Sequence, residues 1–166
     1  MTTSLEIKNT GSKAFEFQTL QHTYLQVEGK SAQDPTQCYV EGLEGYGVVD
    51  KITNTEYSWE KKAVTIPDNV DRVYNPPADK VSSNLSVTVA VGEGKKVKIT
   101  GKGLLEGNQA PVSCVLWNPY KDKAAAMGDF GDDQYVDMIC VEPGLLSGST
   151  LEPGKRGSLT QVIEML

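Results

Sequence analysis

The stretch Leu85-Ser-Val-Thr-Val-Ala-Val91, followed by Gly92-Glu-Gly94 and then by Lys95-Lys-Val-Lys-Ile99, decides the fold class of this chain. Apolar side chains recur at every second position on both sides of the glycine-containing turn. Successive side chains of a β-strand point to opposite faces, so this alternation predicts two half-buried strands. A short glycine turn between two such runs is typical of a β-hairpin. We therefore expect an antiparallel hairpin over residues 85–99.

The rest of the chain repeats this pattern of short apolar runs between turn residues. Further predicted strands are Ser4–Asn9, Phe15–Val27, Gln37–Glu41, Tyr57–Ile66, Val70–Tyr74, Ser113–Trp117, Tyr135–Glu142 and Ser158–Leu166. Gly and Pro clusters at residues 42–47, 75–77, 101–103, 142–144 and 152–154 predict turns between them. Lys121–Met127, with three consecutive alanines, has the composition of a short helix. Many short strands with one brief helix predict an all-β fold, an antiparallel β-sandwich.

Length, composition and charge limit the classes of protein to which the chain can belong. Its 166 residues predict a single domain, 1–166. Hydrophobic residues make up 39% and charged residues 23%, which is typical of a globular protein and argues against disorder. The net charge of -6 argues against a nucleic-acid partner, because such a protein needs a basic surface.

Cysteine usage and hydropathy indicate a cytoplasmic protein. The three cysteines, Cys38, Cys114 and Cys140, are odd in number and lack paired spacing, which favours reduced thiols. No apolar run approaches the roughly 20 residues of a membrane span, and no secretory signal is visible, so no membrane partner is expected. The chain opens directly into the predicted strand Ser4–Asn9, whose exposed edge predicts self-association.

His22, the single histidine, is the first candidate for chemistry. In an extended Phe15–Val27 it shares a face with Gln18, Leu20, Tyr24 and Gln26. A mixed face with an imidazole and a phenol is typical of a pocket floor. The alternative is a solvent-facing or hydrogen-bonded strand histidine, which the run alone does not exclude.

Two carboxylates are further candidates. Glu142 is in phase with Met138 and Cys140 at the end of an apolar strand, and Asp71 lies between Val70 and Arg72. Each also has a plain interpretation, as a strand-end or surface carboxylate that points into water. Glu142 and His22 cost stability if they are buried without a purpose, so an acid–base pair is worth testing.

The sequence contains no recognisable cofactor or metal motif. The acidic run Asp129-Phe-Gly-Asp-Asp133 lacks the spacing of a calcium loop, and the Gly-x-Gly pairs lack the residues of a phosphate loop. A single His with scattered Cys does not predict a zinc site. We expect neither metal nor cofactor.

Six segments, in order along the chain, resemble the aldose 1-epimerase superfamily, and within it the hexose-6-phosphate mutarotases. They are Phe15-Glu-Phe-Gln-Thr-Leu-Gln-His-Thr-Tyr24, Val40-Glu-Gly-Leu43, Asp71-Arg-Val-Tyr74, Val115-Leu-Trp-Asn-Pro119, Val136-Asp-Met-Ile-Cys-Val-Glu142 and Leu151-Glu-Pro-Gly154. The resemblance implies a large twisted galactose mutarotase-like sandwich. It also implies that His22 and Glu142 are catalytic, that Asp71 binds sugar hydroxyls, and that the partner is a small sugar phosphate.

The function implied is that of a glucose-6-phosphate 1-epimerase, an isomerase that interconverts α and β anomers. Glu142 would take the C1 hydroxyl proton while His22, as an imidazolium, protonates O5 and opens the ring. We expect the two groups on opposite sides of one sugar-sized hollow. We also expect the carboxylate to stay ionised beside the imidazolium.

The chain departs from the family in length, because it resembles the C-terminal half alone. The other half of such proteins supplies arginines for the 6-phosphate. Arg72 and Arg156, the arginines of this chain, do not match those positions. The alternative function is therefore a non-catalytic carbohydrate-binding or scaffold sandwich derived from the family. A half-sandwich that pairs with itself or with another polypeptide is a further alternative.

Overall fold

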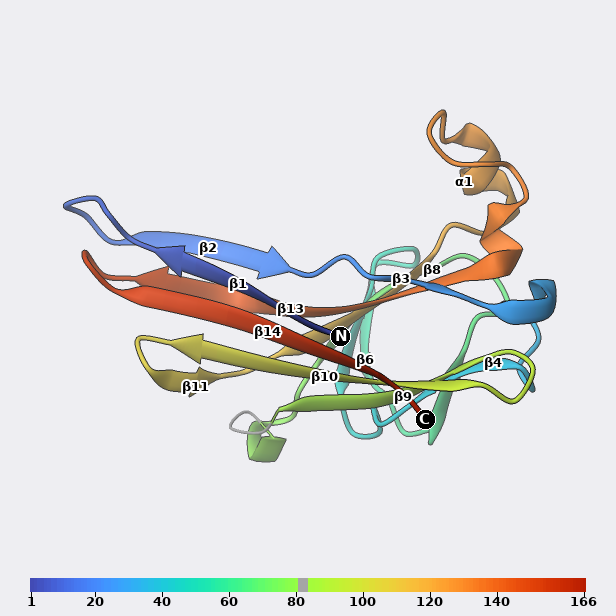
Figure 1. The fold of residues 1–166 in the computed structure, drawn as a ribbon, viewed down its shortest axis with the longest axis horizontal. Coiled ribbons are helices and arrows are strands. Elements are labelled where there is room, and N and C mark those ends of the chain that lie inside the picture. The colour runs from blue at the N-terminus through green and yellow to red at the C-terminus, as the bar shows by residue number, and fades with distance from the viewer. Residues whose placement is uncertain (81–83) are drawn as a thin grey trace.

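The computed structural model describes residues 1–80 and 84–166, which form two antiparallel sheets packed face to face (Figure 1). The first sheet has the order β1-β14-β10-β9-β4-β7, with β11 beside β10. The second sheet has the order β2-β13-β12-β8-β5-β6, with β3 paired to β13. The predicted all-β sandwich is confirmed.

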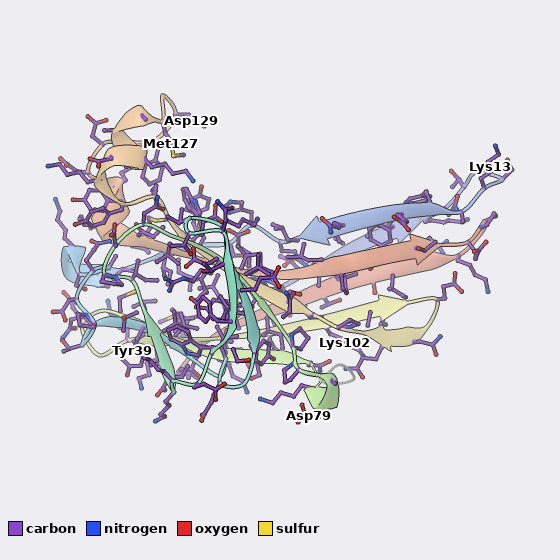
Figure 2. All side chains as sticks on the ribbon, turned by 180° about the vertical axis from the view of Figure 1, so that it is seen from behind. Lys13, Tyr39, Asp79, Lys102, Met127 and Asp129 are labelled. Carbon is purple, nitrogen blue, oxygen red and sulfur yellow. The ribbon has the colours of Figure 1, made fainter. Side chains whose placement is uncertain are left out.

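The strands are β1 (Thr2–Lys8), β2 (Phe15–Leu20), β3 (Tyr24–Gln26), β4 (Cys38–Glu41), β5 (Gly47–Asp50), β6 (Thr55–Ser58), β7 (Ala63–Thr65), β8 (Val70–Asn75), β9 (Leu85–Val91), β10 (Lys96–Leu105), β11 (Asn108–Ala110), β12 (Ser113–Asn118), β13 (Met138–Leu151) and β14 (Arg156–Met165). The α-helix is α1 (Tyr120–Ala126), and short 3-10 turns cover Glu28–Lys30, Ala78–Lys80 and Gln134–Asp137. The molecule is elongated. Lys13, between β1 and β2, marks one end, and Met127 and Asp129, after α1, mark the other (Figure 2).

Alternating side chains build the core between the sheets. Val87 lies opposite Ile99 and Val89 opposite Val97 in the predicted hairpin, which the structure confirms as β9 and β10. These residues pack against alternate residues of the second sheet, among them Val48, Tyr74, Leu116 and Val141. Because every second residue of the second sheet faces inward, the residues between them face outward.

The predicted strand Phe15–Val27 is two strands, β2 and β3, that pair with the same partner, β13. The polar residues between them, 21–23, leave the regular ladder. The register is nevertheless kept, because the Gln21 amide donates to the Pro143 carbonyl (3.0 Å) and the Val141 amide to the Thr23 carbonyl (3.1 Å). This interruption is what frees His22 from the ladder.

Other predicted boundaries are wrong for identifiable reasons. The predicted strand Tyr57–Ile66 is β6 and β7, which belong to different sheets and are separated by the charged run Glu60-Lys-Lys62. The segment before Met138 is a 3-10 turn and not part of the predicted strand Tyr135–Glu142. The short strands β5 and β11 were not predicted.

Two predicted turns lie inside long strands. Residues 101–103 belong to β10 and residues 142–144 to β13. A Cβ atom on Gly101 would lie 2.8 Å from the Cβ of Pro143, and one on Gly103 would lie 2.5 Å from the Cδ2 of Leu145. These glycines therefore mark the close approach of the two sheets and not a turn.

The first strand, β1, lies at the edge of its sheet. β1 pairs with β14 on one side, and among the described residues no strand pairs with its other side. Leu5 on β1 is 41% exposed. In the described part of the chain, none of the helices has the length and apolarity that crossing a bilayer requires.

Candidate active site

The candidate site lies on the outer face of the second sheet. Four neighbouring strands each contribute one side chain to a row across this face. From β5 through β8 and β12 to β13, these are Val49, Val73, Val115 and Glu142. Their sequence neighbours Val48, Tyr74, Leu116 and Val141 belong to the core. The alternation thus places three valines and one carboxylate in a single outward-facing row.

This row is the floor of a hollow of about 580 Å³, a volume typical of a small-ligand site. His22, Asp71 and Glu142, the three residues singled out in the sequence, all line it. Lys51 and Trp117 line it as well. The fold therefore brings the three candidates together from β2–β3, β8 and β13.

His22 and Glu142 are direct neighbours. Leu20 lies opposite Gly144 and Tyr24 opposite Cys140, so His22, midway between, falls opposite Glu142. The Nδ1 atom of His22 is 3.3 Å from Oε1 of Glu142. The expectation that the two groups occupy opposite sides of the hollow is therefore wrong, because cross-strand neighbours share a face.

Aromatic side chains hold the imidazole at this position. The ring of His22 stacks on Tyr24 with a centroid distance of 5.0 Å and an interplanar angle of 13°. The ring of Trp117 is nearly perpendicular to both, with centroid distances of 6.1 Å to His22 and 6.2 Å to Tyr24. The side chain of His22 remains 50% exposed, so a ligand in the hollow can reach it.

Glu142 is almost fully removed from water, and its side chain is 3% exposed. Burial, the larger cause, and the nearby Asp71 carboxylate together raise the pKa of Glu142 to about 7, while Lys51 opposes the rise. A protonated His22 would also oppose it. A group with a pKa of about 7 exchanges its proton near neutral pH, and the ionisation of Glu142 beside an imidazolium stays a prediction.

Asp71 lies on the far side of the hollow between two lysines. Its carboxylate oxygens are 4.0 Å from Nζ of Lys51 and 3.9 Å from Nζ of Lys123. Lys123, from α1, also lies over the ring of Trp117, at 5.7 Å from its centroid. Both lysines are about half exposed, so their charges are available to a ligand as well as to Asp71.

Three further residues at the site, Lys51, Trp117 and Lys123, have no role that the sequence alone predicts. Lys51 follows β5, whose two valines are too short an apolar run to predict a strand. Trp117 is in phase with Val115 along β12, and this signal could have placed it in the row. Lys123 reaches the site only because α1 lies above the end of β12, which no local pattern indicates.

The two arginines are engaged elsewhere. Nε of Arg72 is 2.7 Å from the buried Asp50, and Arg156 pairs with Glu6 on β1. Neither lines the hollow. Positive charge at the hollow therefore comes from lysine and from His22 when it is protonated.

The described residues also include one cluster of metal-ligand type. The ligand atoms of His22, Cys140 and Glu142 all lie within 4.8 Å of one another. The expectation that the chain has no metal-ligand set rested on sequence spacing, and the β3–β13 pairing joins residues that are distant in sequence.

The family described as “Aldose 1-epimerase” matches residues 1–164. This chain belongs to the aldose 1-epimerase family. Two curated relatives, from Cenchrus ciliaris and Escherichia coli K12, carry the name “Putative glucose-6-phosphate 1-epimerase”. They are 32% and 29% identical to this chain over 93% and 88% of its length.

Solved structures agree on the fold of this family member. A crystal structure from Salmonella typhimurium, named as that of a “putative mutarotase”, superimposes with a TM-score of 0.71 at 22% identity over 99% of this chain. A galactose mutarotase-like protein from Clostridium acetobutylicum gives a TM-score of 0.58 at 12% identity over 99% of this chain. The chain covers 50% and 52% of these two proteins, and 43% of each curated relative.

Proposed function

We propose that this chain carries the acid–base pair of a mutarotase, which interconverts the α and β anomers of a hexose. The observation that carries this proposal is the 3.3 Å contact between His22 and Glu142 inside a sugar-sized hollow. Membership of the aldose 1-epimerase family supports it.

The contact suits the chemistry because the two reacting oxygens of the sugar, O1 and O5, are both bonded to C1. Glu142 accepts the proton of the C1 hydroxyl as the C1–O5 bond breaks, and protonated His22 donates its proton to O5. The product is the open-chain aldehyde. Rotation about C1–C2 followed by the reverse transfers closes the ring as the other anomer. Two adjacent groups reach both oxygens, so opposite placement is not required.

The remaining side chains of the hollow fit a sugar. The carboxylate of Asp71 accepts hydrogen bonds from ring hydroxyls, and Lys51 and Lys123 hold it in place. The apolar row Val49, Val73 and Val115 lies beside Glu142, and these apolar surroundings keep the carboxylate basic.

We further propose a hexose 6-phosphate, such as glucose 6-phosphate, as the substrate. The names of the two curated relatives and the two lysines beside the hollow support this choice. The arginines give no support, because both are paired away from the hollow. Anomer exchange should then be faster with glucose 6-phosphate than with glucose at the same sub-saturating concentration.

The experiment is two-dimensional exchange NMR on a mixture of anomers with catalytic amounts of the full chain. We expect His22→Ala to reduce the exchange rate by about 10²–10⁴-fold, the range for a positioned acid or base. Glu60→Gln, an exposed carboxylate away from the hollow, is the control and should leave the rate unchanged. Undiminished exchange in His22→Ala contradicts the proposal.

The second candidate function is a non-catalytic carbohydrate-binding or scaffold sandwich. It is favoured by one observation, that the chain spans 43% of the length of its curated relatives. This candidate predicts saturable chemical-shift changes on adding sugar phosphate, with anomer exchange no faster than in buffer. The same NMR sample therefore separates the two.

A further inference from the structure

Cys140 lies on the same face of β13 as Glu142, two residues earlier. It is fully buried and lies opposite Tyr24, the residue that stacks on His22. Neither the acid–base chemistry nor the sugar contacts use its thiol. Its Sγ, a nitrogen of His22 and a carboxylate oxygen of Glu142 lie within 4.8 Å of one another.

We propose that His22, Cys140 and Glu142 form a binding site for a thiolate-seeking divalent cation such as Zn²⁺, which blocks the acid–base pair. One imidazole, one thiolate and one carboxylate are all established ligand types for zinc. Soft sulfur beside imidazole selects Zn²⁺ over Mg²⁺ or Ca²⁺, which require oxygen ligands.

The geometry needs little adjustment. Two ligand atoms bound about 2.0–2.1 Å from a tetrahedral zinc ion are about 3.4 Å apart. The distance from Nδ1 of His22 to Oε1 of Glu142 is 3.3 Å, so this edge of the tetrahedron already exists. Sulfur, with its longer bond of about 2.3 Å, must lie about 3.6 Å from each of the other two ligand atoms. In the structure, Sγ lies within 4.8 Å of both atoms, so side-chain rotation must shorten these distances by at most about 1 Å.

Two of the three ligand residues face the hollow. His22 and Glu142 line it, while Cys140 is fully buried opposite Tyr24 and Trp117. Three protein ligands with one open position are typical of an accessible zinc site and unlike a closed structural one. A cation entering from the hollow therefore meets Glu142 and His22 first and the thiol last.

Binding exchanges protons for metal, without oxidation or reduction. The thiol of Cys140 loses its proton to solvent as the Zn–S bond forms, and any proton on Glu142 or on the ligating nitrogen of His22 is released in the same way. Without the cation, the lone pairs of His22 and Glu142 are free for proton transfer.

Occupation by a cation and catalysis exclude each other, because they use the same lone pairs. Zn²⁺ should therefore inhibit anomer exchange reversibly and in competition with the sugar. This inhibition rests on the proposed function, whereas binding of the cation does not.

The test uses the full chain, freed of metal with a chelator and then titrated with Co²⁺. Thiolate ligation gives an intense sulfur-to-cobalt charge-transfer absorption, which we expect in the wild-type chain and in Cys38→Ala. Cys38 is an equally buried cysteine on β4 of the other sheet, so it is the matched control. We expect Cys140→Ala to lose the absorption and to keep the circular dichroism spectrum of the wild-type chain.

The second readout is inhibition of anomer exchange by Zn²⁺. Cys140→Ala removes one of three ligands, so it should raise the half-inhibitory concentration of Zn²⁺ by at least about tenfold. With a chelator present, Cys140→Ala should catalyse anomer exchange at the rate of the wild-type chain. A missing charge-transfer band in the wild-type chain, or equal Zn²⁺ inhibition of the wild-type and Cys140→Ala chains, overturns the proposal. If the chain catalyses no exchange at all, the proposed function fails, and the cobalt spectrum alone decides the metal site.

Discussion

At the scale of single residues, Glu142 determines how the site responds to pH. Its carboxyl group is held among valines, with the Asp71 carboxylate and the Lys51 ammonium group as opposing charges. Because burial raises the pKa of Glu142 to about 7, the group can lose and regain a proton near neutral pH. This is the property that a general base in a mutarotase requires.

The rate of anomer exchange should therefore rise with pH near about 7, as Glu142 becomes a carboxylate, and fall again at higher pH, because the mechanism also requires a proton on His22. Lys51→Ala removes the charge that lowers the pKa and should move this rise to higher pH, whereas Asp71→Asn should move it to lower pH. The measurement is kcat/KM for glucose 6-phosphate against pH, in buffer with a chelator. A rise near pH 4.5, or shifts of the opposite sign, contradicts this account.

The same burial should cost stability at high pH. The folded state raises the pKa of Glu142 from 4.5 to about 7, so this side chain favours folding fully below about pH 4.5 and loses that contribution as the pH rises through 7. Glu142→Gln removes the ionisation and should increase the free energy of unfolding by up to about 3 kcal/mol near pH 9. Near pH 4 the two proteins should be similar. Urea unfolding near pH 4 and near pH 9 measures the free energy of unfolding of both proteins. A Glu142→Gln chain that is less stable than the wild-type chain near pH 9 contradicts the prediction.

Local pattern and the family resemblance singled out His22, Asp71 and Glu142 as candidates, and the structure places all three at one hollow. Their distances could not be predicted, since they depend on the register of β2, β3 and β13. That register places His22 opposite Glu142 and Cys140 opposite Tyr24. Cys140 is the clearest example. It is one of three scattered cysteines, and nothing in its sequence context indicates a metal ligand.

At the scale of elements, the contact between β10 and β13 positions Glu142. Gly101 on β10 lies against Pro143, the residue after Glu142. Sequence reasoning assigned both glycine clusters to turns, because a glycine that permits two sheets to approach and a glycine that permits a turn look alike in sequence. Alternation, in contrast, was sufficient for the hairpin β9–β10, where each strand buries one face.

Gly101→Ala should therefore destabilise the chain by about 1–3 kcal/mol, the usual cost of overpacking, because its Cβ would lie 2.8 Å from Pro143. It should also slow anomer exchange, since β13 must shift beside Glu142. Gly47→Ala on β5 is the control, because its Cβ meets no atom within 4 Å and its backbone is not left-handed. Equal thermal stability of the two variants contradicts this interpretation of the sheet contact.

At the scale of the whole molecule, the two sheets both end at strands near the N-terminus, β1 and β2. Leu5 on β1 is 41% exposed and Phe15 on β2 is 39% exposed. Unpaired strand edges with apolar side chains beside them are sites where another strand can add. We propose that a second copy of this chain pairs with β1 and covers these side chains.

Sedimentation velocity of the wild-type chain should then show a concentration-dependent dimer. Leu5→Lys places a charge at the exposed edge and should shift the equilibrium to the monomer. Lys102→Glu, on β10 in the interior of the first sheet, also changes an exposed charge and should leave the equilibrium unchanged. A wild-type chain that stays monomeric at all concentrations contradicts the proposed pairing.

The central claim is that His22 and Glu142 act as one acid–base unit, and a double-mutant cycle tests it most directly. Anomer exchange of glucose 6-phosphate is measured by exchange NMR for the wild-type chain, His22→Gln, Glu142→Gln and the double variant. Groups that act as a unit are not additive, so we expect the double variant to lose no more than about the larger single loss. Wild-type exchange rates in either single variant, or losses that simply multiply in the double variant, contradict the claim.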